Sequence, residues 1–233
     1  MDGTTYQRRR GEIRTYFDET AVEAWKRFAS EAPLGRIRTS VRAGRARMRA
    51  EMLACLPGDL RGWRILDAGC GTGALAVELA RRGADVLGVD IAPEIIRFAT
   101  ETVPADLGPG RITFRAGDML DASYGRFDAV TAMDSLIHYS AADAAAALAT
   151  LAARTQRRIV FTHAPRTPAL TVMHAMGKLL PRANRSPRIV PTTPQNLLSR
   201  FSAAPDAADW MAGRSVRVAH GFYTSQCQEL RRP

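Results

Sequence analysis

One stretch of nine residues constrains the fold of this chain more than any other. Residues 65–73 read Ile-Leu-Asp-Ala-Gly-Cys-Gly-Thr-Gly, an apolar run that ends in alternating glycines. A second apolar run, residues 84–90, ends in the carboxylate of Asp90. The glycines let the backbone turn tightly and approach a ligand closely, and a helix expected at residues 74–82 points its N-terminus at that ligand. The pattern predicts a strand, a loop, a helix and a second strand that form a nucleotide-binding cradle.

Two classes of cofactor use such a cradle. The spacing Gly69-x-Gly71-x-x-Ala74 satisfies the dinucleotide fingerprint in its alanine form. However, Asp67 precedes the loop, and a further glycine, Gly73, falls one residue early for that fingerprint. A carboxylate there would repel a pyrophosphate, whereas it suits the cationic end of S-adenosylmethionine. We therefore expect S-adenosylmethionine, and a nicotinamide-dependent oxidoreductase and an inactive cofactor-binding scaffold are the competing classes.

The length, the apolar runs and the cysteine content of the chain limit its fold class and its cellular location. A chain of 233 residues suits one α/β domain with additions, and no apolar run approaches the ~20 residues that cross a bilayer. The first ten residues lack the apolar segment of a signal peptide. Three widely spaced cysteines, Cys55, Cys70 and Cys227, indicate neither a disulfide framework nor a zinc site. We expect a cytoplasmic protein that holds no metal of its own.

The net charge of +10 allows several interpretations. A solvated basic surface, an anionic substrate and an anionic membrane surface all agree with it. Nucleic acid ranks last, because arginines and aromatic residues are not interleaved in the way that stacks bases.

Strands and helices alternate from residue 63 onward, which predicts an α/β fold with a seven-stranded, mostly parallel sheet covered on both faces. Residues 1–60 are expected to form a helical cap on a cofactor domain at 61–233, with a proline-rich insert at about 165–194 before the last two strands. The cap helices are expected at 12–28 and 37–56, the second with an arginine-rich face. Strands are expected at 63–68, 84–90, 111–116, 127–133, 157–163, 215–219 and 221–227, and further helices at 93–102 and 142–153.

The carboxyl ends of strands in an open α/β sheet face the ligand crevice. Four successive strand ends carry suitable polar groups. We expect Asp90 to accept hydrogen bonds from the ribose hydroxyls and Asp118 to accept one from the adenine amino group, although Asp118 also suits a helix cap. The expected cofactor-binding residues are Asp67, Gly69, Cys70, Gly71, Gly73, Asp90, Ile91, Asp118, Met119 and Met133.

His138 follows the fourth strand, where a methyl acceptor would meet the sulfonium; a surface loop histidine is the alternative. His163 follows the fifth strand and is expected to line the same cleft. The chain lacks the Asn/Asp-Pro-Pro-aromatic tetrapeptide of amino-group methylation at this strand end, and it lacks the acid and histidine spacing of a catechol metal site. What remains is an oxygen acceptor that needs little activation.

The glycine loop resembles the first motif of class I methyltransferases. Beyond it, nearly the whole chain is similar to the magnesium-protoporphyrin IX O-methyltransferase family of bacteriochlorophyll biosynthesis. The matching pieces are Tyr16-Phe-Asp-Glu-Thr20 with Trp25, Leu66 to Ala80, Met133-Asp-Ser-Leu-Ile-His-Tyr139, Ala164-Pro-Arg-Thr-Pro168, Gly177-Lys-Leu-Leu-Pro-Arg182 with Arg185-Ser-Pro187, and Phe222-Tyr-Thr-Ser-Gln-Cys227.

This resemblance implies a Rossmann-like fold and esterification of one propionate of Mg-protoporphyrin IX. His138 would then orient the attacking carboxylate, with Tyr139 assisting or packing. The N-terminal cap would place Tyr16, Phe17 and Trp25 against the macrocycle. Lys178 and Arg182 of the insert would act as a basic lid. The alternatives are that the insert forms a basic surface loop or contacts a membrane. The family also implies handover from a magnesium chelatase subunit.

Two reservations follow from the sequence itself. Some relatives carry a tyrosine a few residues past the tryptophan, where this chain has Phe28-Ala29, so that hydroxyl has no counterpart here. An O-methyltransferase for another anionic or quinonoid small molecule is the competing function.

Overall fold

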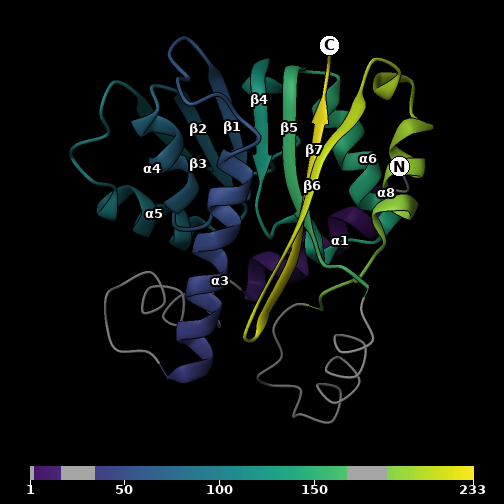
Figure 1. The fold of residues 1–233 in the computed structure, drawn as a ribbon, viewed down its shortest axis with the longest axis horizontal. Helices are drawn as coiled ribbons and strands as arrows, with labels where there is room; N and C mark the ends of the chain where they lie inside the picture. Colours follow the sequence, from purple (N-terminus) through teal and green to yellow (C-terminus); the bar gives the residue numbers. More distant parts are fainter. Residues whose placement is uncertain (1–2, 17–34, 167–187) are drawn as a thin grey trace.

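The computed structural model describes residues 3–16, 35–166 and 188–233, and over these residues seven strands form one sheet (Figure 1). The strand order is β3-β2-β1-β4-β5-β7-β6. The first five strands are parallel, and β7 runs antiparallel to both β5 and β6. This confirms the predicted class I methyltransferase fold. The strands are β1 Arg64–Ala68, β2 Asp85–Asp90, β3 Arg111–Ala116, β4 Phe127–Ala132, β5 Thr155–His163, β6 Met211–His220 and β7 Tyr223–Arg231.

Helices cover both faces of the sheet, and each face has its own buried cluster. One cluster joins α6 and α8 to the sheet through residues such as Leu148 and Phe201. The other joins α3 and α4 to it through Met48 and Leu79. The helices are α1 Gly3–Thr15, α3 Arg36–Leu53, α4 Ala74–Arg81, α5 Pro93–Thr102, α6 Ala141–Ala152 and α8 Pro194–Ser202, with short 3-10 helices η2 Ala122–Tyr124, η3 Leu136–His138 and η5 Pro205–Ala207.

The helix α3 packs against the hairpin formed by β6 and β7. Gly44 makes the close approach possible: a Cβ at this position would lie 2.6 Å from the Cβ of Tyr223. Met48 and Met52, one and two turns further on, are fully buried. The helix that was expected to cap the sheet domain therefore shares its core, and the domain boundary near residue 60 stays a prediction.

The elements differ most from the predicted ones at three places, beside shifts of up to three residues at the ends of α3 and β5. The first helix begins at Gly3, well before residue 12, and residues 17–28 of the predicted helix lie outside the described residues. The helix α8 was not predicted; it begins at Pro194, where the predicted proline-rich insert ends, and Pro194 occupies the first turn, where its missing N–H costs nothing. The strands β6 and β7 are also longer than predicted.

None of the helices in the described parts of the chain is long and apolar enough to span a membrane.

Candidate active site

The glycine loop follows β1 and passes between β2 and the segment after β4. Gly69 and Gly73 have φ angles of 75° and 80°, in the left-handed region that glycine adopts most readily. A Cβ on Gly69 would lie 2.4 Å from the Cβ of Ser135, and one on Gly73 would lie 2.5 Å from the ring of Phe114. Only glycine therefore fits at these two positions of the loop, which ends at the N-terminus of α4.

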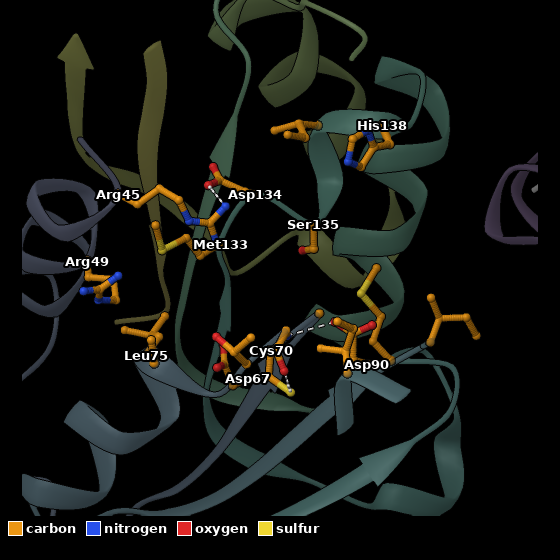
Figure 2. A pocket seen from close by; sticks show the side chains of 18 of the residues that line it. Arg45, Arg49, Asp67, Cys70, Leu75, Asp90, Met133, Asp134, Ser135 and His138 are labelled. Atoms are coloured by element: carbon orange, nitrogen blue, oxygen red, sulfur yellow. Dashed lines mark hydrogen bonds and ion pairs between the residues drawn. The ribbon is translucent and has the colours of Figure 1, made fainter. Parts of the chain in front are cut away.

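A cavity of about 1210 Å³ opens at the carboxyl ends of the parallel strands (Figure 2). Its volume exceeds the roughly 300–1,000 Å³ typical of a single small-molecule site, so it has room for a nucleotide cofactor and part of a second ligand. The residues predicted from sequence that line it are Tyr16, Asp67, Gly69, Cys70, Gly71, Asp90, Ile91, Asp118, Met119, Met133, His138 and Tyr139.

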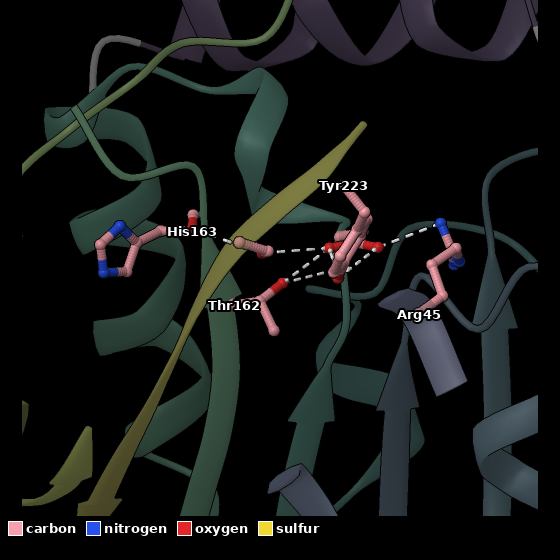
Figure 3. Close-up of polar contacts among 6 residues, drawn as sticks. Arg45, Thr162, His163 and Tyr223 are labelled. Carbon is pink, nitrogen blue, oxygen red and sulfur yellow. Dashed lines mark hydrogen bonds and ion pairs between the residues drawn. The ribbon is translucent and has the colours of Figure 1, made fainter. Parts of the chain in front are cut away.

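The remaining predicted residues fall into two groups. Gly73 and His163 do not line the cavity. The ring of His163 is buried and points away from the polar cluster around Tyr223 (Figure 3), and burial lowers its pKa to about 4. The expectation that His163 lines the cleft is therefore not met by the geometry. Phe17, Trp25, Lys178 and Arg182 lie outside the described residues.

Two carboxylates lie beside the glycine loop, in different environments. Asp90 accepts a hydrogen bond from the backbone N–H of Gly71 at 2.9 Å and one from that of Ala92 at 3.1 Å. Asp67 is 1% exposed and accepts a hydrogen bond from the hydroxyl of Thr131 at 2.8 Å. Burial raises the pKa of Asp67 to about 7, with the charge of Asp90 adding to the effect. A cation placed in the cavity would reverse this shift and hold Asp67 in its charged form.

The thiol of Cys70 also lies at this loop. Burial raises its pKa well above the ordinary value of a cysteine, and the charges of Asp90 and Asp67 add to that effect. Because the thiolate is the reactive form, this shift disfavours Cys70 as a nucleophile.

The helix α1 lies across the carboxyl end of the sheet and contacts the predicted adenine end of the cavity (Figure 1). The phenol of Tyr6 donates a hydrogen bond to Asp118 at 3.0 Å, and Arg10 forms an ion pair with the same carboxylate. The ring of Tyr6 stacks on that of Tyr139, with centroids 4.9 Å apart. Sequence reasoning missed Tyr6 and Arg10, since the predicted helix began after them.

His138 occupies the last position of η3 and is largely buried. Its Nδ1 lies 3.4 Å from the carbonyl oxygen of Arg188. A carbonyl only accepts hydrogen bonds, so this contact favours a proton on Nδ1. From α1, Arg9 donates hydrogen bonds to the carbonyl oxygens of His138 and Arg188, at 2.8 and 3.3 Å. Arg9 thus joins α1, the loop after β4 and the segment that begins at residue 188.

A second polar cluster lies between β4 and α3 (Figure 3). Asp134 has a φ of 54° and is the one non-glycine residue in the described ranges with a positive φ. Its carboxylate accepts hydrogen bonds from Tyr223 and Thr162 at 3.1 Å each and pairs with Arg45 at 3.0 Å. Sequence reasoning placed Arg45 on an arginine-rich outer face of its helix, whereas Arg42, Arg45 and Arg49 line the cavity.

Within the described residues, no group of three or more histidine, cysteine, aspartate or glutamate side chains is arranged to hold a metal ion.

The sheet order, the glycine loop and the carboxylates at the ends of β1, β2 and β3 define a class I S-adenosylmethionine-dependent methyltransferase. The general profile of the methyltransferase domain matches residues 65–157, and a profile described as the magnesium-protoporphyrin IX methyltransferase C-terminus matches residues 132–232. The chain belongs to the magnesium-protoporphyrin O-methyltransferase family.

Individual relatives support this assignment. The chain is 46% identical to the magnesium-protoporphyrin O-methyltransferase of Rhodobacter capsulatus, over 97% of this chain and 98% of that protein. It is 32% identical to the Synechocystis protein of the same name, over 76% of this chain and 77% of that one. The crystal structure of magnesium protoporphyrin IX methyltransferase from Synechocystis PCC 6803 with bound SAH superposes with a TM-score of 0.83 at 28% identity, covering 96% of this chain and 99% of that one.

Proposed function

We propose that this protein transfers the methyl group of S-adenosylmethionine to a propionate carboxylate of Mg-protoporphyrin IX, giving the monomethyl ester. The observation that carries the proposal is the similarity, at 46% identity over 97% of the chain, to a relative named for this activity. The large cavity at the strand ends agrees with it, because the reaction needs a nucleotide and a macrocycle side by side.

The strand ends would hold S-adenosylmethionine, which supplies an electrophilic methyl group on a sulfonium. Asp90 would accept hydrogen bonds from the ribose, since each carboxylate oxygen has lone pairs beyond the one that its backbone partner uses. Asp118 would face the adenine, and Asp67 would balance the positive charge of the amino-acid end. The backbone of the glycine loop would contact the cofactor directly.

The acceptor itself needs little activation. A propionate is ionised at neutral pH, because the pKa of such carboxyl groups is about 4. Alignment of the carboxylate oxygen, methyl carbon and sulfur is then the main task, and good orientation can lower a barrier by roughly 7–11 kcal/mol. Exclusion of water from the buried strand ends strengthens the nucleophile further.

His138 would orient the attacking carboxylate. A carboxylate accepts hydrogen bonds, so His138 has to offer it an N–H. Since Nδ1 faces the carbonyl of Arg188, Nε2 is the ring nitrogen that would have to carry the proton offered to the carboxylate. The ring of Tyr139 stacks on that of Tyr6 and would support the cavity wall beside the imidazole of His138. This packing role does not require the hydroxyl of Tyr139.

The macrocycle would lie toward the open side of the cavity, where Tyr16 contributes to the lining. Phe17, Trp25, Lys178 and Arg182 would complete that side, as the family resemblance implies. Exposed apolar side chains support a peripheral membrane contact: Ile37 is 55% and Phe222 is 59% exposed, and Ser40 hydrogen-bonds the backbone N–H of Phe222, so they lie on adjoining segments. Delivery by a magnesium chelatase subunit rests on the resemblance alone.

The test is incubation of the purified protein with S-adenosylmethionine and Mg-protoporphyrin IX, followed by mass analysis of the porphyrin. We expect a gain of one methyl group, and we expect Asp90→Ala to raise the KM for S-adenosylmethionine far more than the KM for the porphyrin. Binding of S-adenosylmethionine without porphyrin methylation would reject this substrate and favour another anionic or quinonoid acceptor. Unchanged cofactor binding by Asp90→Ala would reject the ribose assignment.

A further inference from the structure

Three arginines of α3 face the cavity, and Arg45 and Arg49 pair with acids that differ in burial. Arg42, Arg45 and Arg49 are spaced by three and four residues, which places them on one side of the helix. Arg49 pairs with Glu78 of α4 at 3.2 Å, an acid that is itself 42% exposed. Arg45 pairs instead with Asp134, whose side chain is only 8% exposed. Arg45 is therefore fixed by the interior of the protein.

The partner of Arg45 is fixed in turn by side chains of two strands, β5 and β7. The backbone N–H of Asp134 donates to the hydroxyl of Thr162 on β5 at 2.7 Å, and that hydroxyl donates to the carboxylate at 3.1 Å. The hydroxyls of Tyr223 and Ser225 on β7 lie 3.1 and 3.4 Å from the same carboxylate oxygen. A left-handed backbone at a non-glycine residue persists only where the surroundings over-determine it, and these contacts do so for Asp134.

The charges around Asp134 favour one arrangement of protons. Burial and the charge of Asp134 raise the pKa of Tyr223 far above its ordinary value, so the phenol keeps its proton and donates. The carboxylate of Asp134 accepts from the hydroxyl of Tyr223, and Arg45 supplies the balancing positive charge. A guanidinium has five N–H groups in a planar fork, so it can bind Asp134 along one edge and a second carboxylate along another.

The position of Arg45 matches the far end of the cofactor site. In Figure 2, Asp90 lies on one side of the cavity, Asp67 and Cys70 lie in the middle, and Arg45 and Asp134 lie beyond Met133. A nucleotide whose ribose contacts Asp90 would extend its amino-acid end toward Met133 and Arg45. The reaction proposed above brings two kinds of carboxylate to this region: the α-carboxylate of S-adenosylmethionine and the porphyrin propionate that is not methylated.

We infer that Arg45 is a carboxylate-binding residue of the cavity, with Asp134 and Tyr223 as positioning residues that aim its guanidinium. The assignment rests on the proposed function for the identity of the two ligands. It does not depend on which of the two carboxylates Arg45 contacts.

Binding measurements separate the two sources. We would compare S-adenosylhomocysteine, which carries the amino-acid end, with 5′-methylthioadenosine, which lacks it, on wild type, Arg45→Met and the control Arg47→Met. Arg47 lies on the same helix and is exposed, outside the cavity lining. If Arg45 binds the cofactor carboxylate, Arg45→Met raises the Kd of S-adenosylhomocysteine about tenfold or more and leaves that of 5′-methylthioadenosine unchanged.

If Arg45 binds the free propionate, both Kd values stay unchanged and the KM for Mg-protoporphyrin IX rises by about the same factor. Arg45→Lys should then restore part of the loss, because it keeps the charge and loses the fork. No change in any of these quantities for a folded Arg45→Met protein would overturn the assignment. Failure of wild type to methylate the porphyrin would reject the proposed function instead, and the inference would then be decided by the S-adenosylhomocysteine comparison alone.

Asp134→Asn tests the positioning role. Asparagine tolerates the left-handed backbone and removes the charge that holds Arg45. Arg45→Met is expected to raise either the Kd of S-adenosylhomocysteine or the KM for Mg-protoporphyrin IX. We expect Asp134→Asn to raise the same one of these two constants, by a smaller factor, with kcat nearly unchanged. A loss confined to kcat would reject the positioning role, and a loss of folded protein with normal ligand binding in the remainder would mean that Asp134 has a purely structural role.

Discussion

The phenol of Tyr6 donates a hydrogen bond to the carboxylate of Asp118 at 3.0 Å, and so joins two residues that stand 112 positions apart in the chain. This contact places the first helix on the carboxylate that is expected to bind adenine. If Asp118 binds adenine as proposed, the N-terminal segment forms part of the cofactor site, and its attachment can be measured separately from catalysis.

The first prediction concerns this contact. Tyr6→Phe keeps the aromatic stack on Tyr139 and removes one hydrogen bond, so the free energy of unfolding should fall by about 1 kcal/mol. The affinity for S-adenosylhomocysteine should stay within about threefold of wild type, whereas Asp118→Ala should weaken it about tenfold. Calorimetric titration measures both affinities. Equal effects of the two substitutions would contradict the adenine assignment of Asp118.

The second prediction is a pH dependence of cofactor binding. The pKa of Asp67 is raised to about 7, so the carboxyl is largely protonated at about pH 6 and ionised at about pH 8. S-adenosylmethionine is cationic and favours the ionised form. Its affinity should therefore rise about tenfold over that interval, following the ionised fraction of Asp67. The matched control is Asp67→Asn, in which only the titration of the ligand itself remains; an identical pH profile in both proteins would contradict the role of Asp67.

The third prediction concerns the effect of the Asp67 carboxyl on the free energy of unfolding. A raised pKa means that the folded state penalises the charged carboxylate, so the free energy of unfolding should fall as pH rises from about 4 to about 7 and stay level above. Asp67→Asn keeps the hydrogen bond to Thr131 without the charge. It should stabilise the protein by about 1–3 kcal/mol at pH 8, and the gain should shrink toward pH 5. Urea unfolding at both pH values measures this; a gain that grows toward acid would show that the pKa is lowered.

The fourth prediction concerns His138. His138→Ala should lower kcat by about tenfold or more, because the attacking carboxylate loses the group that orients it. The Kd of S-adenosylhomocysteine should remain near that of wild type. Single-turnover methylation and equilibrium binding separate the two effects. Unchanged turnover would remove His138 from the mechanism, and parallel losses of turnover and cofactor affinity would point to a disturbed loop.

The fifth prediction compares two helical glycines. Alanine at Gly44 would place its Cβ 2.6 Å from the Cβ of Tyr223, so Gly44→Ala should force α3 away from β7 and lower the free energy of unfolding by about 1–3 kcal/mol. Gly11 on α1 has no atom within 4 Å of such a Cβ. Gly11→Ala should therefore stabilise by about 0.5–1 kcal/mol through helix propensity alone. Similar changes in both variants would mean that α3 does not approach β7 as closely as described.

The residues at the strand ends could be predicted from the sequence because two local rules determine them. Apolar runs of strand length locate the strands, and parallel strands direct the following residues to one edge of the sheet. Asp67, Asp90 and Met133 were found in this way, and the structure places all three in the cavity lining. The seven-stranded sheet followed from the same reading.

The residues that were missed depend on contacts between distant segments. Residues 4–10 are mostly polar, and their apolar residues do not recur at helical spacing. No local sequence pattern therefore indicated Tyr6 or its contact with Asp118. Asp134 has a backbone that propensity disfavours, and its partners come from α3, β5 and β7. The placement of Arg45 needed the crossing of α3 over the last hairpin, which no local pattern encodes.

The hairpin of β6 and β7 supplies Tyr223 and Ser225 to Asp134 and also closes one edge of the sheet. Since β6 pairs with β7, and β7 in turn with β5, the edge strand has no independent attachment within the sheet. Heat, denaturant or a protease that detaches β7 from β5 would release both strands together and dismantle the cluster around Arg45 in the same event. Ligand recognition at that wall and the integrity of the sheet edge would then fail at a single transition, so a ligand bound to Arg45 would also protect the hairpin from cleavage.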